Sequence, residues 1–490
     1  MIEAPDGKTL SFENASDAVA ELCRRYELAT SFLREKFMQY LKGNSEGGRY
    51  RAYYPEIRIT TTSFARIDSR LSFGHVSGPG TYSTTITRPT LFHDYLENQL
   101  GLLINNHGVA LEVADSNVPI PLHFAFNEGD TLDSGNSVNQ EATIRDAFDT
   151  PDLAFMDDSI VNGDFEGVPG APNPLAPFTA PRVDYSLYRL AHYTGTSPHH
   201  FQNYVLFTNY QFYIDRFVDF AEQSLADPDS VYEEFVTPGN RITCREDCRD
   251  AQANAVPLSR MPQMPAYHLK SGNRCGITLV NIGIGPSNAK TITDHIAVLR
   301  SHTWIMLGHC AGLRNSQSLG DYVLAHGYVR EDHVLDEDVP ISVPVPPLAE
   351  VQVALQEAVA EVTGLAGYDL KNIMRTGTVA TIDNRNWELR DQKGPVKRLS
   401  QSRAIALDME SATIAANGFR FRVPYGTLLC VSDKPLHGEL KLPGMASEFY
   451  RTQIGRHLLI GIRTLERLKE MPPERLHSRK LRAFDETAFQ

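Results

Sequence analysis

Residues 403–435 constrain the fold of this chain more than any other segment. They read RAIALDMESATIAANGFRFRVPYGTLLCVSDKP, which we interpret as a short apolar strand, a helix of small residues and a second apolar strand. Strands that alternate with helices are typical of α/β sheets. Two carboxylates, Glu410 and Asp433, stand where these strands end. Because ligands of open α/β sheets bind at the carboxyl ends of the strands, we expect both acids to face one crevice.

The same alternation runs through the second half of the chain. The apolar runs NYVLFTN, AYHLKS, GITLVNIG and TWIMLG predict strands, and YQFYIDRFVDFAEQSL and NAKTITDHIAVLR predict helices. A Pro-rich, charged insertion at about 225–265 interrupts this pattern. We therefore predict an α/β sheet with helices on both faces.

The first 160 residues follow a different pattern. Residues 17–42 carry apolar side chains at helical spacing and predict a long amphipathic helix, while YYPEIRITTTS, STTITRPTLF, GLLINNHGVALEVA and IPLHFAF predict mostly antiparallel strands. The Pro- and Gly-rich stretch at 160–181 marks the best boundary. We expect an N-terminal α+β domain at 1–170, a linker at 171–185 and the α/β domain at 186–490.

Composition limits the possible partners and locations. The 490 residues carry a net charge of −13, which argues against a surface for nucleic acid or anionic membrane. No apolar run approaches the length of a bilayer span, and the polar, acidic start is neither a signal nor a transit peptide. Six scattered cysteines fit reduced thiols in a cytoplasmic protein. Cys244 and Cys248 lack a second Cys/His pair, so we predict a solvated loop and no metal site there.

Two strand ends carry small and polar residues that suit a ligand. In GITLVNIGIGPSNAK, Gly283 and Gly285 allow a ligand to approach the backbone at a helix N-terminus. A tight turn that feeds a packed helix explains the same glycines, because GxG alone is a weak signal. In LGHCAGLRNSQSLGD, His309 and Arg314 follow the next strand. A lone histidine in such a place is more often structural than catalytic.

The N-terminal part holds one Gly- and hydroxyl-rich loop, SRLSFGHVSGPGTYS, with Arg70, His75 and Arg88 nearby. Backbone N–H groups of such a loop can cradle a phosphate. The loop is equally compatible with a plain surface turn.

The order of five motifs resembles the nucleoside phosphorylase/hydrolase superfamily over roughly 186–470. These motifs are GIGPSNA, LGHCAG, GTVATID, LDMES and VSDKP. Within the superfamily the chain is most similar to the AMP nucleosidases, and this likeness extends over nearly the whole chain, including NNHGVALEV and DNRNWELR. The resemblance implies a Rossmann-like sheet that curls partly into a barrel, in oligomers that are often hexameric.

The resemblance assigns roles to the two acids. It implies that Met409 and Glu410 grip the ribose, that Asp433 protonates the purine at N7, and that Gly285 lies under the ribose or phosphate. Protonation of Asp433 near neutral pH requires desolvation beneath the purine. From the residues alone, Asp433 is equally suited to pairing with Lys434 or to capping the next helix.

The resemblance also implies a base pocket and a contribution from a second subunit. Asp383 and Trp387, within 377–387, match the segment that lines the base, and His192 matches a histidine that enters a neighbouring subunit's site. A bound 5′-phosphate needs a cation or a nest of N–H groups. The candidates for that group are Arg314, Lys434 and the loop 74–84.

Departures from the superfamily pattern indicate the nucleophile. Phosphorylases of this superfamily carry two arginines at their orthophosphate site, where this chain has Phe212 and Met306. Water is therefore the expected nucleophile. Related hydrolases orient that water with a glutamate in the first turn, but TNYQF has no carboxylate. Asn209, Tyr210 and Glu448 are conceivable replacements.

We therefore expect hydrolysis of the N-glycosidic bond of AMP to adenine and D-ribose 5-phosphate, in purine salvage and control of the adenylate pool. No cofactor is expected. The resemblance implies activation by ATP and inhibition by phosphate through the N-terminal domain, with a divalent metal only as the companion of ATP. The alternatives are a purine nucleoside phosphorylase-type transferase and a non-catalytic nucleotide sensor on the same fold. An NAD-dependent enzyme is disfavoured by the incomplete glycine pattern.

Overall fold

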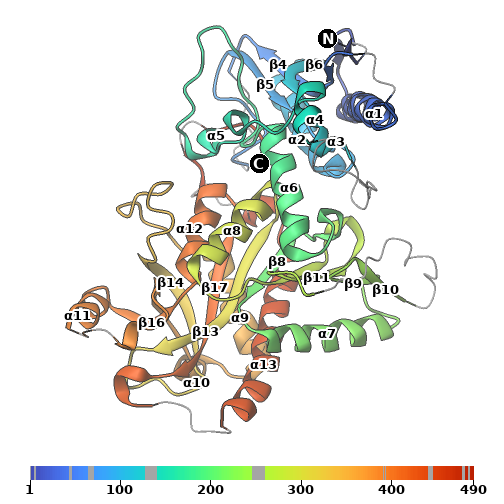
Figure 1. Ribbon diagram of the computed structural model, residues 1–490. Coiled ribbons are helices and arrows are strands. Elements are labelled where there is room, and N and C mark those ends of the chain that lie inside the picture. Colours follow the sequence, from blue (N-terminus) through green and yellow to red (C-terminus); the bar gives the residue numbers. More distant parts are fainter. Residues whose placement is uncertain are drawn as a thin grey trace. The chain divides into compact units, whose positions relative to one another are not determined.

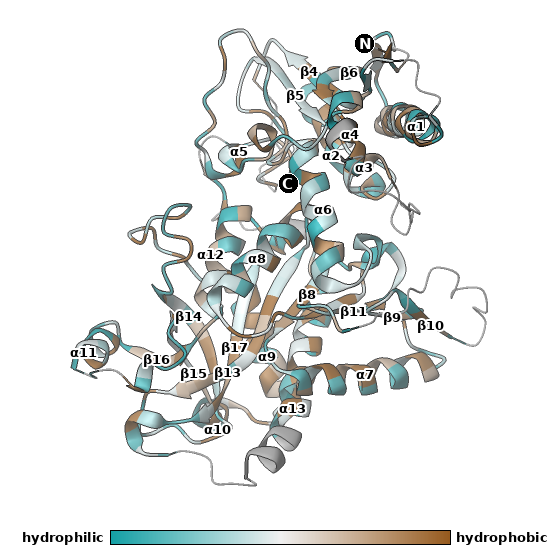
Figure 2. Ribbon diagram, viewed as in Figure 1, coloured by the Kyte–Doolittle hydropathy of each residue, from teal (hydrophilic) through white to brown (hydrophobic). Residues whose placement is uncertain are grey.

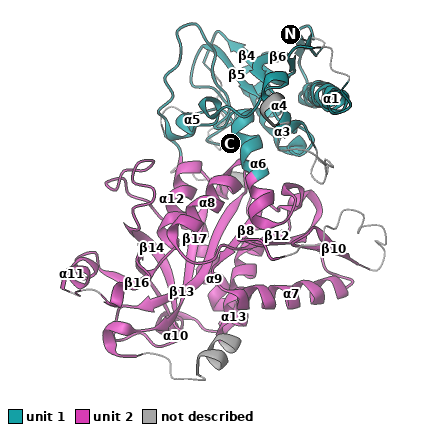
Figure 3. Cartoon of the chain, viewed as in Figure 1, with its two compact units in different colours: residues 1–188, 482–490 teal, residues 189–481 magenta. Residues whose placement is uncertain are grey.

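The computed structural model describes residues 2–4, 7–43, 47–64, 71–126, 141–245, 260–389, 391, 393–439, 445–476, 481–483 and 486–490. The chain divides into two compact units (Figure 3). Unit 1 comprises residues 1–188 and 482–490, and unit 2 comprises residues 189–481.

The boundary lies later than we expected. Residues 171–185 are not a free linker, because β7 (Asn173–Pro174) pairs in parallel with β5 (Gly80–Thr85). Helix α6 (Ala180–Thr194) then begins within the same stretch. The backbone N–H of Phe489 donates to the carbonyl of Leu175 at 2.9 Å, so residues 482–490 join unit 1 rather than the α/β unit.

Unit 1 has the expected α+β architecture. Its main sheet has the order β2-β6-β4-β5-β7 and is antiparallel except for the β5–β7 pair. Helix α1 (Ala15–Leu41) packs on this sheet, and Asn14 caps it by accepting from the N–H groups of Ser16 and Asp17. The remaining elements of unit 1 are β1 (Ile2–Glu3), β2 (Leu10–Phe12), β3 (Tyr50–Arg51), β4 (Tyr53–Thr61), α2 (His93–His107), β6 (Leu111–Pro119), α3 (Leu122–Ala125), α4 (Glu141–Ala147), the 3₁₀ helix η2 (Leu153–Phe155) and α5 (Ser159–Asn162).

Two segments predicted as strands are helical. GLLINNH forms the last part of α2, and LHFA of IPLHFAF forms α3. Leu96, Leu100 and Leu103 are buried along α2, and their spacing is that of one helix face. The strand prediction began at residue 101, after the first two of these leucines, and so missed the helical period.

Unit 2 contains a ten-stranded sheet with helices packed on it (Figure 1). Its strand order is β10-β9-β11-β12-β8-β13-β16-β15-β14-β17, and β12, β8, β13 and β17 run parallel to their neighbours in that part of the sheet. The predicted strands NYVLFTN, AYHLKS, GITLVNIG, TWIMLG, RAIAL and YGTLLCV are all confirmed. The strands are β8 (Tyr204–Thr208), β9 (Glu234–Thr237), β10 (Arg241–Cys244), β11 (Ala266–Lys270), β12 (Ile277–Asn281), β13 (Thr303–Gly312), β14 (Tyr322–Glu331), β15 (Met374–Ile382), β16 (Ala404–Asp408) and β17 (Tyr425–Asp433).

Part of this sheet closes on itself. Strand β13 pairs with β8 over residues 303–306 and with β16 at Ala311 and Gly312, while its other edge pairs with β17. Because β16, β15, β14 and β17 also pair in succession, five strands form a closed ring. The expected curling of the sheet is therefore confirmed.

Helices of unit 2 pack in two groups, α8 with α12 and α13 with α7 and α9. Figure 2 shows both hydrophilic and hydrophobic residues along α7, as its amphipathic pattern predicts. The helices of unit 2 are α7 (Gln211–Ala226), α8 (Pro286–Ile296), α9 (Ala349–Thr363), α10 (Gly367–Ile373), α11 (Lys393–Gln401), α12 (Ser411–Phe421), α13 (Met445–Lys469) and α14 (Pro473–Leu476).

The predicted insertion at 225–265 contributes two strands, β9 and β10, which extend the sheet beyond β11. Residues 246–259, which include Cys248, lie outside the described residues. In the described part of the chain, no helix has the length and apolar character needed to span a bilayer.

Candidate active site

Glu410 lies where three distant segments meet. It directly precedes α12 and is buried. Its Oε1 accepts from the backbone N–H of Gly285 at 2.7 Å, and its Oε2 accepts from Asn209 Nδ2 at 2.9 Å. Gly285 has φ +113°, which strains any residue with a side chain, so glycine is needed for its N–H to point at the carboxylate.

The electrostatic environment of Glu410 contains opposing effects. Burial, aided by the nearby Asp408 carboxylate, raises the pKa of Glu410, whereas the donors Gly285 and Asn209 act to lower it. Burial therefore works against the anionic state that ribose binding was expected to require. These two donors favour the anion, as does the backbone hydrogen bond from Met409.

Asp408 is held in place just before Glu410. Its Oδ1 accepts from Thr381 Oγ1 at 2.5 Å, and its Oδ2 accepts from the backbone N–H of Ser411 at 2.9 Å and from the Ser411 hydroxyl. Burial raises the pKa of Asp408 as well. The carboxylate thus ties the start of α12 to the end of β15 and adds negative potential beside Glu410.

Asp433 is the last residue of β17 and is partly exposed. Its backbone pairs with Ala311 of β13, whose opposite side pairs with Leu407 of β16. The pairing shifts between Cys310 and Ala311, leaving Ser432 as an extra residue. Such bulges re-aim side chains near functional sites. The sheet therefore brings the two acid-bearing segments to the carboxyl-terminal end of β13. They flank Ala311 and are about 10 Å apart by strand spacing.

The surroundings of Asp433 exclude one structural alternative. Ser432 Oγ donates to Asp433 Oδ1 at 2.7 Å. Lys434 is buried, and its Nζ donates to the carbonyls of Asn315 and Gln317 and pairs with Glu439 at 2.6 Å. The ammonium group is therefore used to fix the loop after β13 rather than to neutralise Asp433.

His309 lies on β13 among aromatic rings. Its imidazole centroid is 5.1 Å from the ring of Tyr210 and 5.6 Å from that of Tyr213. Next to it, a Cβ on Gly308 would lie 2.8 Å from Met306 Cε, so a larger residue here would displace the end of the Met306 side chain. The setting places His309 and Tyr210 at the ends of adjacent strands.

The other residues expected at the site are more dispersed. Met409 is half-buried beside Glu410, and Asp383 is exposed just after β15. Trp387 packs against the buried cluster that contains Leu407. His192 is exposed in the last turn of α6.

Arg314 is half-buried in the loop after β13, where its backbone N–H donates to Gln317 Oε1 at 2.9 Å. The backbone of Glu448 belongs to α13, but its side chain lies outside the described residues.

The N-terminal loop is less open to an anion than its sequence indicates. Its Gly74 N–H donates to the carbonyl of Ala488 at 2.6 Å, and its Val76 N–H donates to His107 Nε2 at 3.0 Å. Arg88 pairs with the buried Asp184 at 3.3 Å. Arg70 falls outside the described residues. Among those residues, no group of three or more His, Cys, Asp or Glu side chains is placed to hold a metal ion.

Sequence reasoning missed two parts of this arrangement. Asp408 stands in the LDMES motif but was given no role, although its position two residues before Glu410 was a usable signal. Asn209 was considered only for the water, whereas its amide contacts Glu410. No local pattern announces that contact, because it joins residues 201 positions apart.

Comparisons with known proteins agree with this architecture. Residues 17–172 match the family model described as the N-terminus of bacterial AMP nucleoside phosphorylase, and residues 252–453 match the phosphorylase superfamily. Proteins named AMP nucleosidase from Escherichia coli strain K12 and from Escherichia coli O157:H7 are each 47% identical over 483 residues, which is 97% of this chain and 98% of theirs. A crystal structure of AMP nucleosidase from Bacteroides thetaiotaomicron VPI-5482 is 27% identical, covers 59% of this chain and 98% of its own, and has a TM-score of 0.42.

Proposed function

The chain belongs to the AMP nucleosidase family, and from this premise we propose that it hydrolyses the N-glycosidic bond of AMP to adenine and D-ribose 5-phosphate. The observation that carries the proposal is the setting of Glu410. This buried carboxylate accepts hydrogen bonds from Gly285 and Asn209, and it lies at the same end of the sheet as Asp433. Two carboxylates with different environments suit a bond whose two sides develop opposite charge.

Cleavage of an N-riboside passes through a state in which positive charge grows on the sugar, as in other glycosidases. In our proposal, Glu410 accepts hydrogen bonds from the ribose hydroxyls and stabilises that charge. Met409 packs beside the sugar. The donors Gly285 and Asn209 favour the anionic form that this task requires, against the effect of burial.

On the other side of the bond, electrons flow into the adenine. A protonated Asp433 would give its proton to N7 and make adenine a better leaving group, a contribution of about 10²–10⁴-fold. The bulge at Ser432 and the hydrogen bond from its hydroxyl support this role, because they orient the carboxyl group. We place Asp383 and Trp387 near the base and Arg314 near the 5′-phosphate.

Water is the proposed nucleophile. Of the two positions that hold arginines in phosphorylases, Phe212 is 47% exposed and Met306 is fully buried in β13. Neither side chain can bind orthophosphate by charge. The rival proposal, phosphorolysis, would need another cation for that purpose.

The finer parts of the proposal concern control and assembly. We propose that ATP activates the enzyme, that phosphate inhibits it, and that it acts in purine salvage in the cytoplasm. We also propose a homo-oligomer in which His192 reaches a neighbouring site. Light scattering tests whether this oligomer is a hexamer. The exposure of His192 is compatible with such a contact.

One assay tests the central proposal. Adenine release is measured from AMP and from adenosine, each with and without orthophosphate and ATP. We expect AMP to be the better substrate, turnover without orthophosphate, and ribose 5-phosphate as the sugar product. A strict requirement for orthophosphate would instead establish a phosphorylase, and no release of adenine under any condition would favour a sensor.

A further inference from the structure

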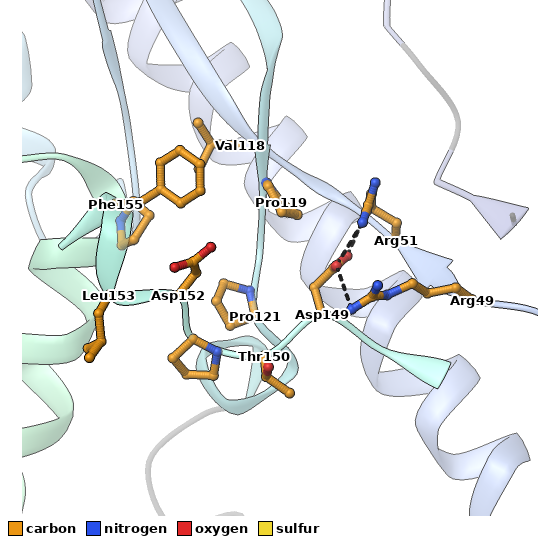
Figure 4. Close-up of a pocket in the computed structure, with 12 residues that line it drawn as sticks. Arg49, Arg51, Val118, Pro119, Pro121, Asp149, Thr150, Asp152, Leu153 and Phe155 are labelled. Carbon is orange, nitrogen blue, oxygen red and sulfur yellow. Dashed lines mark hydrogen bonds and ion pairs between the residues drawn. The ribbon is translucent and has the colours of Figure 1, made fainter. Parts of the chain in front are cut away.

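Asp408 is buried beside the candidate active site, and none of the roles above is assigned to it. Burial of a charged carboxylate is costly unless a cation or hydrogen bonds compensate for it. Asp149 of unit 1 has such cations, because Arg49 and Arg51 both pair with it (Figure 4). Among the described residues no lysine or arginine pairs with Asp408, and the groups that lower its pKa are hydroxyl and backbone N–H groups. This acid is thus held by hydrogen bonds rather than by an ion pair.

The Thr381 hydroxyl is the central group of this hydrogen-bond arrangement. It is fully buried, donates to Asp408 Oδ1 at 2.5 Å and accepts from the backbone N–H of Ala412 at 2.9 Å. Asp408 Oδ2 in turn accepts from the backbone N–H of Ser411 at 2.9 Å and from the Ser411 hydroxyl. Glu410 lies between these bonded positions, as the residue that directly precedes α12. Its place in the site is therefore fixed by contacts on both sides of it along the chain.

A second buried acid anchors the same helix further along. The hydroxyl of Thr413 donates to Asp332 Oδ2 at 2.6 Å, and Asp332 directly follows β14. Strands β14, β15 and β16 run parallel, so three strand ends hold successive residues of the first turn of α12. Burial raises the pKa of Asp332 as it raises that of Asp408. Asp332 is therefore a matched acid that anchors α12 without adjoining Glu410 in the sequence.

Asp408 also acts on Glu410 by its charge. Burial is the larger cause of the raised pKa of Glu410, and the Asp408 carboxylate adds to it. Asp408 likewise adds to the effect of burial in raising the pKa of the Cys310 thiol on β13 and of the Tyr328 hydroxyl on β14. Both of those groups are neutral at physiological pH, because their pKa values lie above the ordinary values of 9.0 and 10.0. Glu410 is therefore the neighbour whose charge responds to Asp408 near neutral pH.

The same contacts adjoin the segment that we place near the base. Trp387 packs on the buried cluster that contains Ala380 and Leu407. Those two residues directly precede Thr381 and Asp408 in β15 and β16. The bond between Thr381 and Asp408 therefore joins the strand that leads to the base segment to the start of α12.

We propose that Thr381 and Asp408 are positioning residues for the hydrolysis of AMP, which act through Glu410 without contacting the substrate. The Thr381 hydroxyl orients the Asp408 carboxylate, and Asp408 fixes the start of α12 and adds negative charge next to the ribose-binding acid. A second anion near the sugar stabilises the positive charge that develops on it in the transition state. The assignment rests on the proposed function, because it needs Glu410 to bind the ribose.

Asp408→Asn separates the charge of the side chain from its shape. We expect kcat for AMP to fall about ten-fold while KM changes little, because the lost charge acts on the transition state. The acidic limb of kcat/KM should also move to lower pH by about one unit, since Asp408 no longer raises the pKa of Glu410. Asp332→Asn is the matched control and should leave the limb in place. Equal pH profiles of the two variants, or a rise in KM without a fall in kcat, would overturn the role of Asp408.

The role of Thr381 is tested by removing and restoring its hydroxyl. Thr381→Val keeps the shape of the side chain but removes the donor to Asp408 and the acceptor for the Ala412 N–H, and it should lower kcat about ten-fold. Thr381→Ser keeps the hydroxyl and should stay within about two-fold of the wild type. Thr413→Val removes the bond from the same turn of α12 to Asp332 and should have as small an effect. A loss in Thr381→Val that Thr381→Ser or Thr413→Val matches, or no loss at all, would exclude Thr381 as a positioning residue.

A stability measurement tests the charge coupling without catalysis. Urea denaturation at about pH 6 and pH 8 gives the effect of Glu410→Gln on the free energy of unfolding, once in the Asp408→Asn background and once in the Asp332→Asn background. This effect should increase less with pH in the Asp408→Asn background, because the pKa of Glu410 is lower there. An equal increase in both backgrounds would refute the coupling even if AMP is hydrolysed normally. Unequal increases in a chain whose wild type releases no adenine would support the coupling and refute the proposed function.

Discussion

Asn209 donates a 2.9 Å hydrogen bond to the buried carboxylate of Glu410, which lies 201 residues further along the chain. Asn209 is the first residue after β8, and Glu410 directly precedes α12. The charge state of Glu410, the proposed ribose-binding acid, therefore depends on a side chain at the end of a different strand, β8. The Asn209 amide is the side-chain donor to this carboxylate, and the backbones of Gly285 and Met409 donate to it as well.

Asn209→Ala should shift the pH dependence of hydrolysis. The lost hydrogen bond lowers the pKa of Glu410 in the wild type, so its removal raises that pKa further. If Glu410 acts as an anion, the acidic limb of kcat/KM moves to higher pH, by about one unit for a bond to a charged group. Gln211→Ala is the control, since its exposed amide bonds Asp215 instead. Identical pH profiles for the two variants would show that Asn209 does not tune Glu410.

Glu410→Gln should inactivate the enzyme but stabilise the ligand-free fold at neutral and higher pH. Burial raises the pKa of Glu410 in the folded state above that of a free glutamate side chain, 4.5, so its favourable contribution is present below pH 4.5 and is lost as pH rises through the folded-state pKa. Glutamine avoids this loss, with a gain of roughly 1–3 kcal/mol. Urea denaturation of both proteins at pH 4, 6 and 8 measures the difference. A difference that does not grow with pH would refute this account.

Asp433→Asn should lower kcat by about 10²–10⁴-fold while KM for AMP changes little, because the amide keeps the shape of the side chain but cannot protonate N7. Glu439→Gln provides a control on a nearby acid that pairs with Lys434. Steady-state adenine release measures both variants. Turnover of Asp433→Asn close to that of the wild type would exclude Asp433 as the general acid.

Arg314→Gln should reduce kcat/KM for AMP about ten-fold or more and leave adenosine unaffected, because only AMP carries the 5′-phosphate. Lys434→Met should behave differently. Its ammonium group already binds the carbonyls of Asn315 and Gln317, so its loss should lower the free energy of unfolding rather than the preference for AMP. A selective loss of AMP activity in Lys434→Met, without one in Arg314→Gln, would exchange the roles that we assign to them.

The sequence predicted the strands of unit 2 well because they are buried apolar runs bounded by turns, as in YVLFT of β8 and YGTLLCV of β17. The prediction failed where it divided the chain within an element. Helix α2 is the example, because its buried leucines begin at Leu96 and the predicted strand began after it. The strands within the insertion were not predicted. Strands β9 and β10 are short, and only the pairing of β9 with β11 and of β10 with β9 reveals them as part of the sheet.

The candidate site was predictable in part. The sequence rule that ligands gather where strands end placed Glu410 and Asp433 near each other. The strands do not run parallel, however: β17 is parallel to β13 and β16 is antiparallel to it, and the two acid-bearing segments meet because both pair with Ala311. The bulge at Ser432 and the support from Thr381 to Asp408 were not predictable, since both depend on pairing between segments that no local pattern connects. The same holds for the domain boundary, which depends on a two-residue strand, β7.

Because residues 482–490 return to unit 1, the two units cannot be separated by truncation at a single position. Phe489 is buried there, with its ring 6.2 Å from that of Tyr95, and the N–H of Gln490 donates to Gln99 Oε1 at 2.8 Å. A fragment that lacks residues 1–188 would carry this aromatic tail into solvent, and a fragment of 1–188 would lack a piece of its own core. One proteolytic cut at residue 188 would not release unit 1, because residues 482–490 belong to unit 1 and stay covalently attached to unit 2. Dissection of regulation from catalysis therefore calls for point substitutions in the intact chain.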